Sequence, residues 1–500
     1  MIEKICYDNS ITVFWTKTED IPAEALYNIF LDGKKIATAK STHYTLTGLN
    51  PETEYTVGVE VVCGNESVKK FKDVQCTTKQ VPLCIDVTKP PYNAVGDGKT
   101  LNTHALQKAF DACGKGQRVY FPAGDYMTGS LRLHSDMELY LDEGAILHGT
   151  TDVNDYTPKI HSRFEGIEMM AYAALLNLGN LDRNDSYNCT NVVIRGGGTV
   201  CGGGRKLAEN VIEVEKVLMK DYMESLGDKI LECENSITIP GRVRPRLINM
   251  SNAQNIVISD IEIQNGASWN VHMIYSDNIV THGCTFRSEK VWNGDGWDPD
   301  SSTNCTLFNC RFYTGDDAVA VKSGKNPEGN VVNRPCEHIR VFDCISYYGH
   351  GVTMGSEMSG GINDVRVWDC DLGDSTYGIE IKGTRKRGGY VRNIYVRDSR
   401  VCRVLMHSVG YNDDGEPAPE VPYFEDCRFE NLEITAITYG KDEQRRACAA
   451  IELSGFDEPG HEIKNIRFKD IAINRTPDGE PQTVSLALCK GLYFENINCK

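Results

Sequence analysis

The segment Asn255-Ile-Val-Ile-Ser-Asp-Ile261 carries a pattern that recurs through the second half of the chain. Each copy begins with Asn or a polar substitute, then alternates apolar and polar residues, and places a small or apolar residue six positions after its start. Successive starts from Asn255 to Asn393 are 23, 26, 34, 26 and 29 residues apart. The other copies are Asn278–Cys284, Asn304–Cys310, His338–Cys344, Asp364–Cys370, Asn393–Ser399 and Asn465–Ile471.

A strand-rich repeat of this length predicts an all-β solenoid. One or two short strands per repeat are too few for a four-stranded propeller blade. A right-handed parallel β-helix fits better, because each repeat forms one coil and equivalent strands stack about 4.8 Å apart. We therefore expect residues 84–500 to form a parallel β-helix catalytic domain. The asparagine at the start of each repeat should occupy the same turn in every coil and bond a neighbouring backbone.

The repeat also explains part of the cysteine content. Cys284, Cys310, Cys344 and Cys370 occupy the position that Ile261 and Ile471 fill in other copies, which indicates interior packing. The functional alternative is a metal or redox ladder. The chain has 19 cysteines, an odd number, and no Cys-x-x-Cys pair, so reduced thiols are expected in place of disulfides or a zinc site.

Residues 1–80 have a different pattern, with several short strands separated by turn signals such as Asp32-Gly33. This spacing predicts a small β-sandwich. The stretch Leu49-Asn-Pro-Glu-Thr-Glu-Tyr55, with Trp15 on an early strand, resembles a fibronectin type III domain in which Tyr55 would be the tyrosine corner. A sandwich of this kind is expected to act as a spacer, packing or binding module without chemistry.

Composition excludes some classes of partner. The net charge of −17 argues against nucleic acid, which requires an excess of Lys and Arg. We find no apolar run of about 18 residues, so no membrane span is expected. The start Met1-Ile-Glu-Lys-Ile-Cys-Tyr-Asp8 lacks an apolar signal region, which predicts a cytoplasmic protein, or a secreted or periplasmic one whose leader has been removed. The sequence specifies no oligomeric state.

Acidic residues lie in the segments between the repeats. Asn293-Gly-Asp-Gly-Trp-Asp-Pro-Asp300 precedes the coil that starts at Asn304, and Thr314-Gly-Asp-Asp317 follows the first strand of that coil. Asp317 lies thirteen residues after its coil start, and His350 of Gly349-His-Gly351 lies twelve after the next start. Stacked coils should therefore bring Asp295, Asp316, Asp317 and His350 together on one face.

Carboxylates packed in this way repel one another, so at least one should have a raised pKa. Glycoside hydrolysis uses such a division, with one carboxylic acid to protonate the leaving oxygen and a carboxylate to activate water. The alternative is that these Gly-Asp sequences only terminate strands, since Asp is common in turns.

At these residues the chain resembles the polygalacturonase family, family 28 of the glycoside hydrolases. The resemblance runs from about Asp86 to the C-terminus. Its activity motifs are Asn293-Gly294-Asp295, Thr314-Gly315-Asp316-Asp317, Gly349-His350-Gly351 and Glu380-Ile381-Lys382. Supporting stretches are Ala94-Val-Gly-Asp-Gly-Lys99, Val119-Tyr-Phe-Pro-Ala-Gly124, Gly129-Ser-Leu131, Arg244-Pro-Arg-Leu-Ile248 and Trp269-Asn-Val-His272.

The resemblance implies a pectin-degrading hydrolase that cleaves α-1,4-galacturonosidic bonds with inversion and needs no metal or other cofactor. It implies that Asp316 is the general acid, that Asp295 and Asp317 activate water, and that His350 tunes the acid or positions the substrate. Lys382 would bind a sugar carboxylate, as a lysine beside acidic groups can. The further expected substrate-binding residues are Asn293, Glu380, Arg385, Arg387, Trp269 and His272.

The chain departs from the family pattern at three positions. Gly294 replaces Thr, Ala318 stands where many members have Cys, and Glu380 replaces Arg. The last change removes a cation from the expected carboxylate site, for which Arg385 or Arg387 could compensate. The backbone cleaved therefore stays open between homogalacturonan, a decorated galacturonan and rhamnogalacturonan. The N-terminal module is common in members that trim chain ends, which favours exo action.

Two further hypotheses belong to other classes. Calcium-dependent pectate lyases also use parallel β-helices, and the aspartate cluster could bind Ca²⁺. The chain could also be a non-catalytic carbohydrate-binding solenoid, for which loss of Asp316 would leave binding unchanged. A cytoplasmic hydrolase would act on imported oligosaccharides, so the expected partner is a pectic poly- or oligosaccharide.

Overall fold

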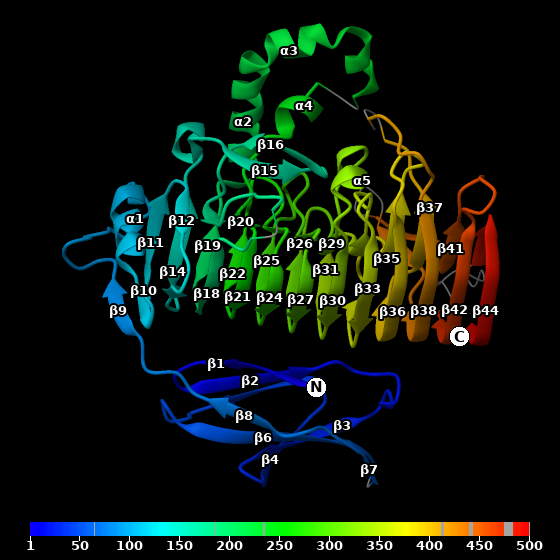
Figure 1. The fold of residues 1–500 in the computed structure, drawn as a ribbon, viewed down its shortest axis with the longest axis horizontal. Helices are drawn as coiled ribbons and strands as arrows, with labels where there is room; N and C mark the ends of the chain where they lie inside the picture. Colours follow the sequence, from blue (N-terminus) through cyan, green and yellow to red (C-terminus); the bar gives the residue numbers. More distant parts are fainter. Residues whose placement is uncertain are drawn as a thin grey trace. The chain divides into compact units, whose positions relative to one another are not determined.

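The computed structural model describes residues 1–64, 66–184, 186–233, 236–411, 415–439, 444–474 and 484–499 (Figure 1). The chain divides into two compact units. One comprises Met1–Cys84 with Gly114–Arg118, and the other comprises Ile85–Cys113 with Val119–Lys500. Within the described ranges, no helix has the length and apolar character needed to cross a membrane.

The N-terminal unit contains two antiparallel sheets. Trp15 is buried in its core, with its ring centroid 5.1 Å from that of Tyr27. The backbone N–H of Asn50 donates a hydrogen bond to the Tyr55 hydroxyl, at 3.0 Å. One sheet consists of β1 (Ile2–Cys6), β2 (Ser10–Trp15) and β5 (His43–Thr47), and the other of β4 (Lys34–Ala39), β3 (Leu26–Leu31), β6 (Glu54–Cys63) and β7 (Glu66–Lys70), with β8 (Val74–Thr77) paired to β6.

The second unit is a parallel β-helix, which confirms the predicted fold class. One face is an eleven-stranded sheet whose neighbouring strands come from successive coils and run parallel. Its strands, in order, are β12 (Leu131–Leu133), β17 (Leu176–Leu178), β20 (Ile248–Ser251), β23 (Val271–Ile274), β26 (Trp297–Asp300), β29 (Val319–Val321), β32 (Gly351–Met354), β35 (Gly378–Gly383), β37 (Val404–Ser408), β41 (Ile451–Ser454) and β43 (Val484–Ala487).

The remaining faces are built from two further rows of strands, which merge in the last coils into the long strands β36, β38, β42 and β44. One row contains β10 (Gln117–Phe121), β13 (Glu138–Leu141), β18 (Cys189–Gly196), β21 (Ala253–Ser259), β24 (Asp277–His282), β27 (Thr303–Phe308), β30 (Cys336–Phe342), β33 (Ile362–Trp368), β36 (Tyr390–Val401), β38 (Tyr423–Ile434), β42 (Ile463–Ile473) and β44 (Cys489–Cys499). The other contains β11 (Gly124–Thr128), β14 (Ala145–Gly149), β19 (Thr199–Cys201), β22 (Glu262–Gln264), β25 (Thr285–Arg287), β28 (Arg311–Tyr313), β31 (Ile345–Tyr348) and β34 (Asp371–Leu372).

Equivalent side chains of successive coils stack on one another, as the repeat predicts. The rings of His282, Phe308, Phe342 and Trp368 lie in one column, with centroid separations of 4.8, 4.9 and 4.3 Å. The four cysteines that follow these rings by two residues, at 284, 310, 344 and 370, are all buried, as expected for interior packing.

The asparagine turns differ from the prediction in their bonding. Asn255, Asn278 and Asn304 all adopt positive φ, between 53° and 57°, which a short polar side chain tolerates. Their amides bond neighbouring side chains, where we expected bonds to the backbone. The Nδ2 of Asn278 donates to the Oδ1 of Asn255 at 2.7 Å, and that of Asn304 donates to Asp277. The bonds run between coils, so they tie each coil to its neighbour.

The segment before the repeats contains the helix α1 (Thr103–Ala112). Asn102 immediately precedes it, but its side chain makes no capping bond to the helix. Its amide instead accepts from the N–H of Val95 and donates to the carbonyl of Val95, at 2.8 and 3.0 Å. The residue therefore fixes the preceding Gly-rich turn.

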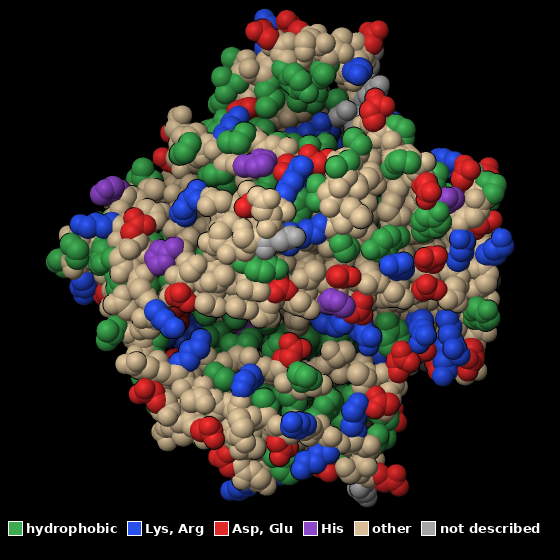
Figure 2. Space-filling model, viewed as in Figure 1, with side chains coloured by type: hydrophobic (Ala, Val, Ile, Leu, Met, Phe, Trp, Pro, Cys, Tyr) green, Lys and Arg blue, Asp and Glu red, His purple; other side chains and the backbone are tan. Residues whose placement is uncertain are grey.

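A helical insertion between β19 and β20 was not predicted from the sequence. Figure 1 shows its helices above the hairpin of β15 (Ile160–Phe164) and β16 (Ile167–Ala171). Hydrophobic side chains gather over it in Figure 2, and Val217, Leu218 and Tyr222 are exposed. The insertion comprises α2 (Gly204–Leu218), α3 (Lys220–Ser225), η2 (Gly227–Glu232) and α4 (Thr238–Gly241). The short elements elsewhere in the chain are β9 (Leu83–Asp86), η1 (Val153–Tyr156), α5 (Glu328–Val332), β39 (Ile437–Tyr439) and β40 (Arg445–Ala447).

Candidate active site

The expected catalytic residues come from consecutive strands of the eleven-stranded sheet. Trp297, Val319 and Val352 are aligned partners on β26, β29 and β32. Asp295, Asp317 and His350 each lie two residues before one of these partners. The register of the sheet therefore places their side chains at one level of three adjacent coils.

These residues line a pocket of about 700 Å³, here called the inner pocket. Its lining contains all four expected catalytic residues and, of the expected substrate-binding residues, Asn293, Trp269, Glu380, Lys382 and Arg387. The insertion contributes Thr238 and Arg242, and the hairpin of β15 and β16 contributes Glu165. The rest of the lining is Lys322, Lys325, Gly355, Ser356, Glu357, Tyr377, His407, Val409, Gly410 and Tyr411.

His350 lies between two carboxylates. Its Nδ1 is 3.0 Å from Oδ1 of Asp316 and 3.2 Å from Oδ1 of Asp317. Burial alone would lower the pKa of His350, but the charges of the two aspartates outweigh it and raise that pKa well above its usual range. His350 is therefore a cation that holds the two carboxylates in place.

Asp317 is the carboxylate that stays ionised. Its side chain is only 4% exposed, and burial would raise its pKa. The charge of Lys382, 3.8 Å away, and the bond from His350 outweigh burial and hold the pKa of Asp317 below its usual range. The Thr353 hydroxyl donates a further bond to Asp317, at 2.7 Å.

Asp295 has the opposite character. Burial, reinforced by the charge of Asp316, raises the pKa of Asp295 to about 8. Asp298 lies deeper and is fully buried, and both of its carboxyl oxygens lack a hydrogen-bond partner among the described residues. Burial and the charge of Asp295 raise the pKa of Asp298 well above its usual range. The cluster thus retains protons at neutral pH beside an ionised Asp317.

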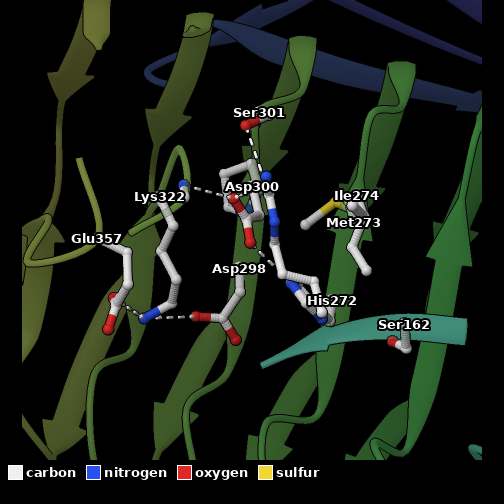
Figure 3. A network of polar contacts seen from close by, with 12 residues as sticks. Ser162, His272, Met273, Ile274, Asp298, Asp300, Ser301, Lys322 and Glu357 are labelled. Carbon is white, nitrogen blue, oxygen red and sulfur yellow. Dashed lines mark hydrogen bonds and ion pairs between the residues drawn. The ribbon is translucent and has the colours of Figure 1, made fainter. Parts of the chain in front are cut away.

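Lys322 is the cation that faces Asp295 and Asp298. Its Nζ lies 3.5 Å from Asp295, 3.8 Å from Asp298 and 3.5 Å from Glu357. Figure 3 shows Lys322 between Asp298 and Glu357, which come from different coils. The Nζ also lies 4.4 Å from the ring centroid of Trp269, so the expected substrate-binding indole supports this lysine.

Glu380 is neutralised within the pocket. One of its oxygens is 3.0 Å from Nζ of Lys382, and the other is 2.8 Å from Nε2 of His407. Burial would raise the pKa of Glu380, but Lys382 and His407 outweigh it and lower that pKa. Lys382 is thus shared between Glu380 and Asp317, and it is a weaker carboxylate anchor than an unpaired lysine would be.

Two of the expected substrate-binding residues lie elsewhere. His272 is completely buried, 3.3 Å from Asp300, and burial lowers its pKa to about 4. Asp300 also accepts a 2.8 Å bond from the fully buried Arg163. In Figure 3 His272 and Asp300 lie beside Asp298. His272 alternates with the core residues Val271 and Met273, so it is on the same outer side of the sheet as Asp298 and is buried there against Asp300. Arg385 is 48% exposed and pairs with Glu458.

Several lining residues were not predicted. Lys322 ends the alternating run Asp317-Ala-Val-Ala-Val-Lys322, which is a signal that the sequence contained. Glu357 and His407 lie outside the motifs, and Arg242 belongs to the insertion, so their place in the pocket follows only from the folded coils. Asp316, Asp317 and His350 place ligand atoms within 4.8 Å of one another and are the group that could hold a metal ion.

The chain is similar in sequence to known proteins. Residues 163–405 match the family model of glycosyl hydrolases family 28. The exo-poly-alpha-D-galacturonosidase of Dickeya chrysanthemi is 27% identical over 98% of this chain and 89% of its own length. A probable polygalacturonase of Vitis vinifera is 36% identical over 61% of this chain and 58% of its own length.

Solved structures show the same fold. The family 28 exopolygalacturonase of Yersinia enterocolitica aligns with 99% of this chain and 95% of its own, with a TM-score of 0.82 at 24% identity. A hyperthermoactive exopolygalacturonase of Thermotoga maritima aligns with 84% of this chain and 93% of its own, with a TM-score of 0.67 at 24% identity.

Proposed function

This chain belongs to glycosyl hydrolase family 28 and is a glycoside hydrolase, and on that premise we propose that it removes galacturonate from the ends of pectic oligo- or polysaccharides by inverting hydrolysis of α-1,4 bonds. The observation that carries the proposal is the meeting of Asp295, Asp316 and Asp317 in one pocket, with His350 between the last two. Inverting hydrolysis requires one protonated and one ionised carboxyl group.

Asp316 is the proposed general acid. Its side chain is 27% exposed, against 3% for Asp295 and 4% for Asp317, so it reaches the space where a glycosidic oxygen would lie. The charge of Asp316 is one cause of the raised pKa of Asp295. The two carboxyl groups are therefore electrostatically coupled. In the proposed reaction Asp316 gives a proton to the leaving oxygen, and Asp295 and Asp317 activate the water.

Exo action is supported by the exo-acting relative, which aligns with almost the whole chain, and by the walls of the inner pocket. On one side Arg242 of the insertion pairs with Glu165 of the hairpin, at 2.9 Å. Other walls come from Lys325 and from Val409, Gly410 and Tyr411. Exo action needs a site that accepts a chain end, and loops that enclose the glycone end of the cleft would provide one.

The raised pKa of Asp295 leads to an expected pH profile. Because that pKa is about 8, the carboxyl cluster carries a proton below that pH and loses it above. Inverting hydrolysis needs a protonated carboxyl group, so the value of kcat should fall about tenfold per pH unit above about pH 8. Asp317, with its lowered pKa, should stay ionised through the mildly acidic range. Initial rates on trigalacturonate across pH check this, and a kcat that stays constant well above pH 8 would contradict a role for this proton.

Digestion of defined oligogalacturonides in the presence of EDTA tests the reaction itself. New reducing ends without ultraviolet absorbance of an unsaturated product are expected, with monomer as the first product. An unsaturated product that forms without EDTA but not with it would indicate a calcium-dependent lyase. Binding without cleavage would indicate a non-catalytic solenoid. If the enzyme cleaves only decorated galacturonan or rhamnogalacturonan, Glu380, which replaces the family arginine, would have a role in substrate choice.

We also propose that residues 1–80 form a fibronectin type III-like module without catalytic residues. The two antiparallel sheets, the buried Trp15 and the bond between Tyr55 and the Asn50 backbone support this proposal. The expected catalytic residues all lie in the second unit of the chain.

A further inference from the structure

A second groove adjoins the inner pocket. This outer groove, of about 900 Å³, shares six lining residues with the inner pocket: Glu165, Thr238, Asn293, Asp316, His350 and Tyr377. Of the described residues, Asp295 and Asp317 line the inner pocket only, whereas Asp316 and His350 line both. Under the proposed function, the two water-activating carboxylates mark the side of the sugar whose anomeric carbon is attacked. The outer groove is therefore the leaving-group side of the bond.

An arginine and a tryptophan form a pair on the wall of the outer groove. The guanidinium carbon of Arg205, on α2, lies 4.3 Å from the ring centroid of Trp292. Trp292 is 38% exposed although it is large and apolar. Both residues line the groove, so a chain segment leaving the acid Asp316 passes beside them.

The loop that carries Trp292 is firmly held. Arg244 is buried, and its Nη1 donates to the carbonyl of Trp292 at 2.8 Å. Its Nη2 donates to Oδ1 of Asn293 at 2.7 Å. The same loop continues to Asp295, so one arginine fixes the position of the indole relative to the catalytic carboxyls. The indole is thus a preorganised platform.

The guanidinium keeps donors available for a ligand. The Nε of Arg205 donates to Glu209 of the same helix, at 3.0 Å. Its two Nη groups make no hydrogen bond to the part of the chain that the structure describes. A guanidinium with two available Nη groups matches the two oxygens of a carboxylate, and stacking on an aromatic ring fixes its plane.

We propose that Arg205, held over the ring of Trp292, binds the carboxylate of the galacturonate residue on the leaving-group side of the scissile bond. This inference rests on the proposed function and assigns a specificity role to the helical insertion. The pair selects a leaving group that is itself an unesterified uronic acid. It takes no part in proton transfer, because Arg205 and Trp292 lie outside the inner pocket that holds the water-activating carboxylates.

Two substrates separate this role from the chemistry. Trigalacturonate carries a carboxylate on its leaving group, and 4-nitrophenyl α-galacturonide does not. Arg205→Gln should raise KM for trigalacturonate about tenfold, the loss expected for a charge-assisted hydrogen bond, with kcat within about twofold. The same variant should cleave the nitrophenyl substrate as well as the wild type does. Trp292→Ala should act like Arg205→Gln, and Trp292→Phe should restore most of the affinity.

The chain offers a matched control in Arg287. Its guanidinium carbon lies 4.2 Å from the ring centroid of Tyr313, and its Nε donates to Glu262 at 2.8 Å, outside both cavities. Arg287→Gln should change neither substrate. An unchanged KM in Arg205→Gln, or an equal loss on both substrates, overturns the inference. A wild type that cleaves neither substrate overturns the proposed function, and this inference with it.

Discussion

Replacement of Asp316 by asparagine is expected to lower kcat on trigalacturonate about a thousandfold or more, within the range that general acid catalysis contributes. The amide has almost the same shape but cannot give a proton to the leaving oxygen. The side chain is partly exposed and bonds to His350, so the fold should stay intact. The thermal midpoint of the variant and kcat on trigalacturonate provide the measurement.

An activated substrate distinguishes the acid from the base. The nitrophenolate of 4-nitrophenyl α-galacturonide leaves without protonation, so Asp316→Asn should lose much less activity on it than on trigalacturonate. Asp317→Asn should lose activity on both, because the water is no longer activated. Asp371→Asn removes an exposed aspartate that pairs with Arg400 and serves as the control. Equal losses of Asp316→Asn on the two substrates would contradict its assignment as the acid.

The repeat explains why the sequence located the carboxylate cluster. Counting from the coil starts placed Asp317 and His350 at nearly the same level, and the sheet register shows them at equivalent positions. A solenoid converts such sequence offsets directly into spatial neighbours, because each coil contacts mainly the coils beside it. The cluster could therefore be predicted without a structure.

Counting residues from the coil starts fails where the direction of a side chain decides whether it faces the site. His272 was expected to bind substrate, yet its side chain is completely buried against Asp300, which Arg163 of the hairpin also contacts. Arg385 and Arg387 lie two residues apart in one turn, and only Arg387 lines the inner pocket. The irregular backbone of that turn has no fixed period, so the sequence could not show which of the two faces the site.

The helical insertion could not be placed for a different reason. Residues 204–241 interrupt the repeat, so no neighbouring coil fixes their position. Helical spacing in this segment would predict helices but not the surface that they cover. Arg242 and Arg205 reach the inner pocket and the outer groove from this insertion, and that result follows only from the packing of α2 and α4.

Replacement of Lys322 by methionine is expected to damage both stability and catalysis. The lysine is 5% exposed and lies within 3.8 Å of Asp295, Asp298 and Glu357, whose charges raise its pKa. Removing one partner of a buried ionic group leaves uncompensated charge, which costs about 3–5 kcal/mol. Urea unfolding should show this loss. Lys159→Met, which uncouples the buried Glu215 outside the inner pocket, should lower stability without changing kcat.

The catalytic effect of Lys322→Met should appear in the pH profile. Lys322 lowers the pKa of Asp295 against burial and the charge of Asp316, so its removal should raise that pKa above about 8. The fall in kcat at high pH should then begin at a higher pH, and kcat itself should drop because Lys322 no longer holds Asp295 in position. Replacing Glu357 by glutamine in the same variant removes one of the carboxylates that have lost their partner lysine. This second change should recover part of the stability but not the pH profile, because Asp295 still lacks its cation. A Lys322→Met variant whose pH profile matches the wild type would show that the proton on Asp295 is independent of the lysine. The pKa of Asp295 would then be determined by Asp316 and burial alone.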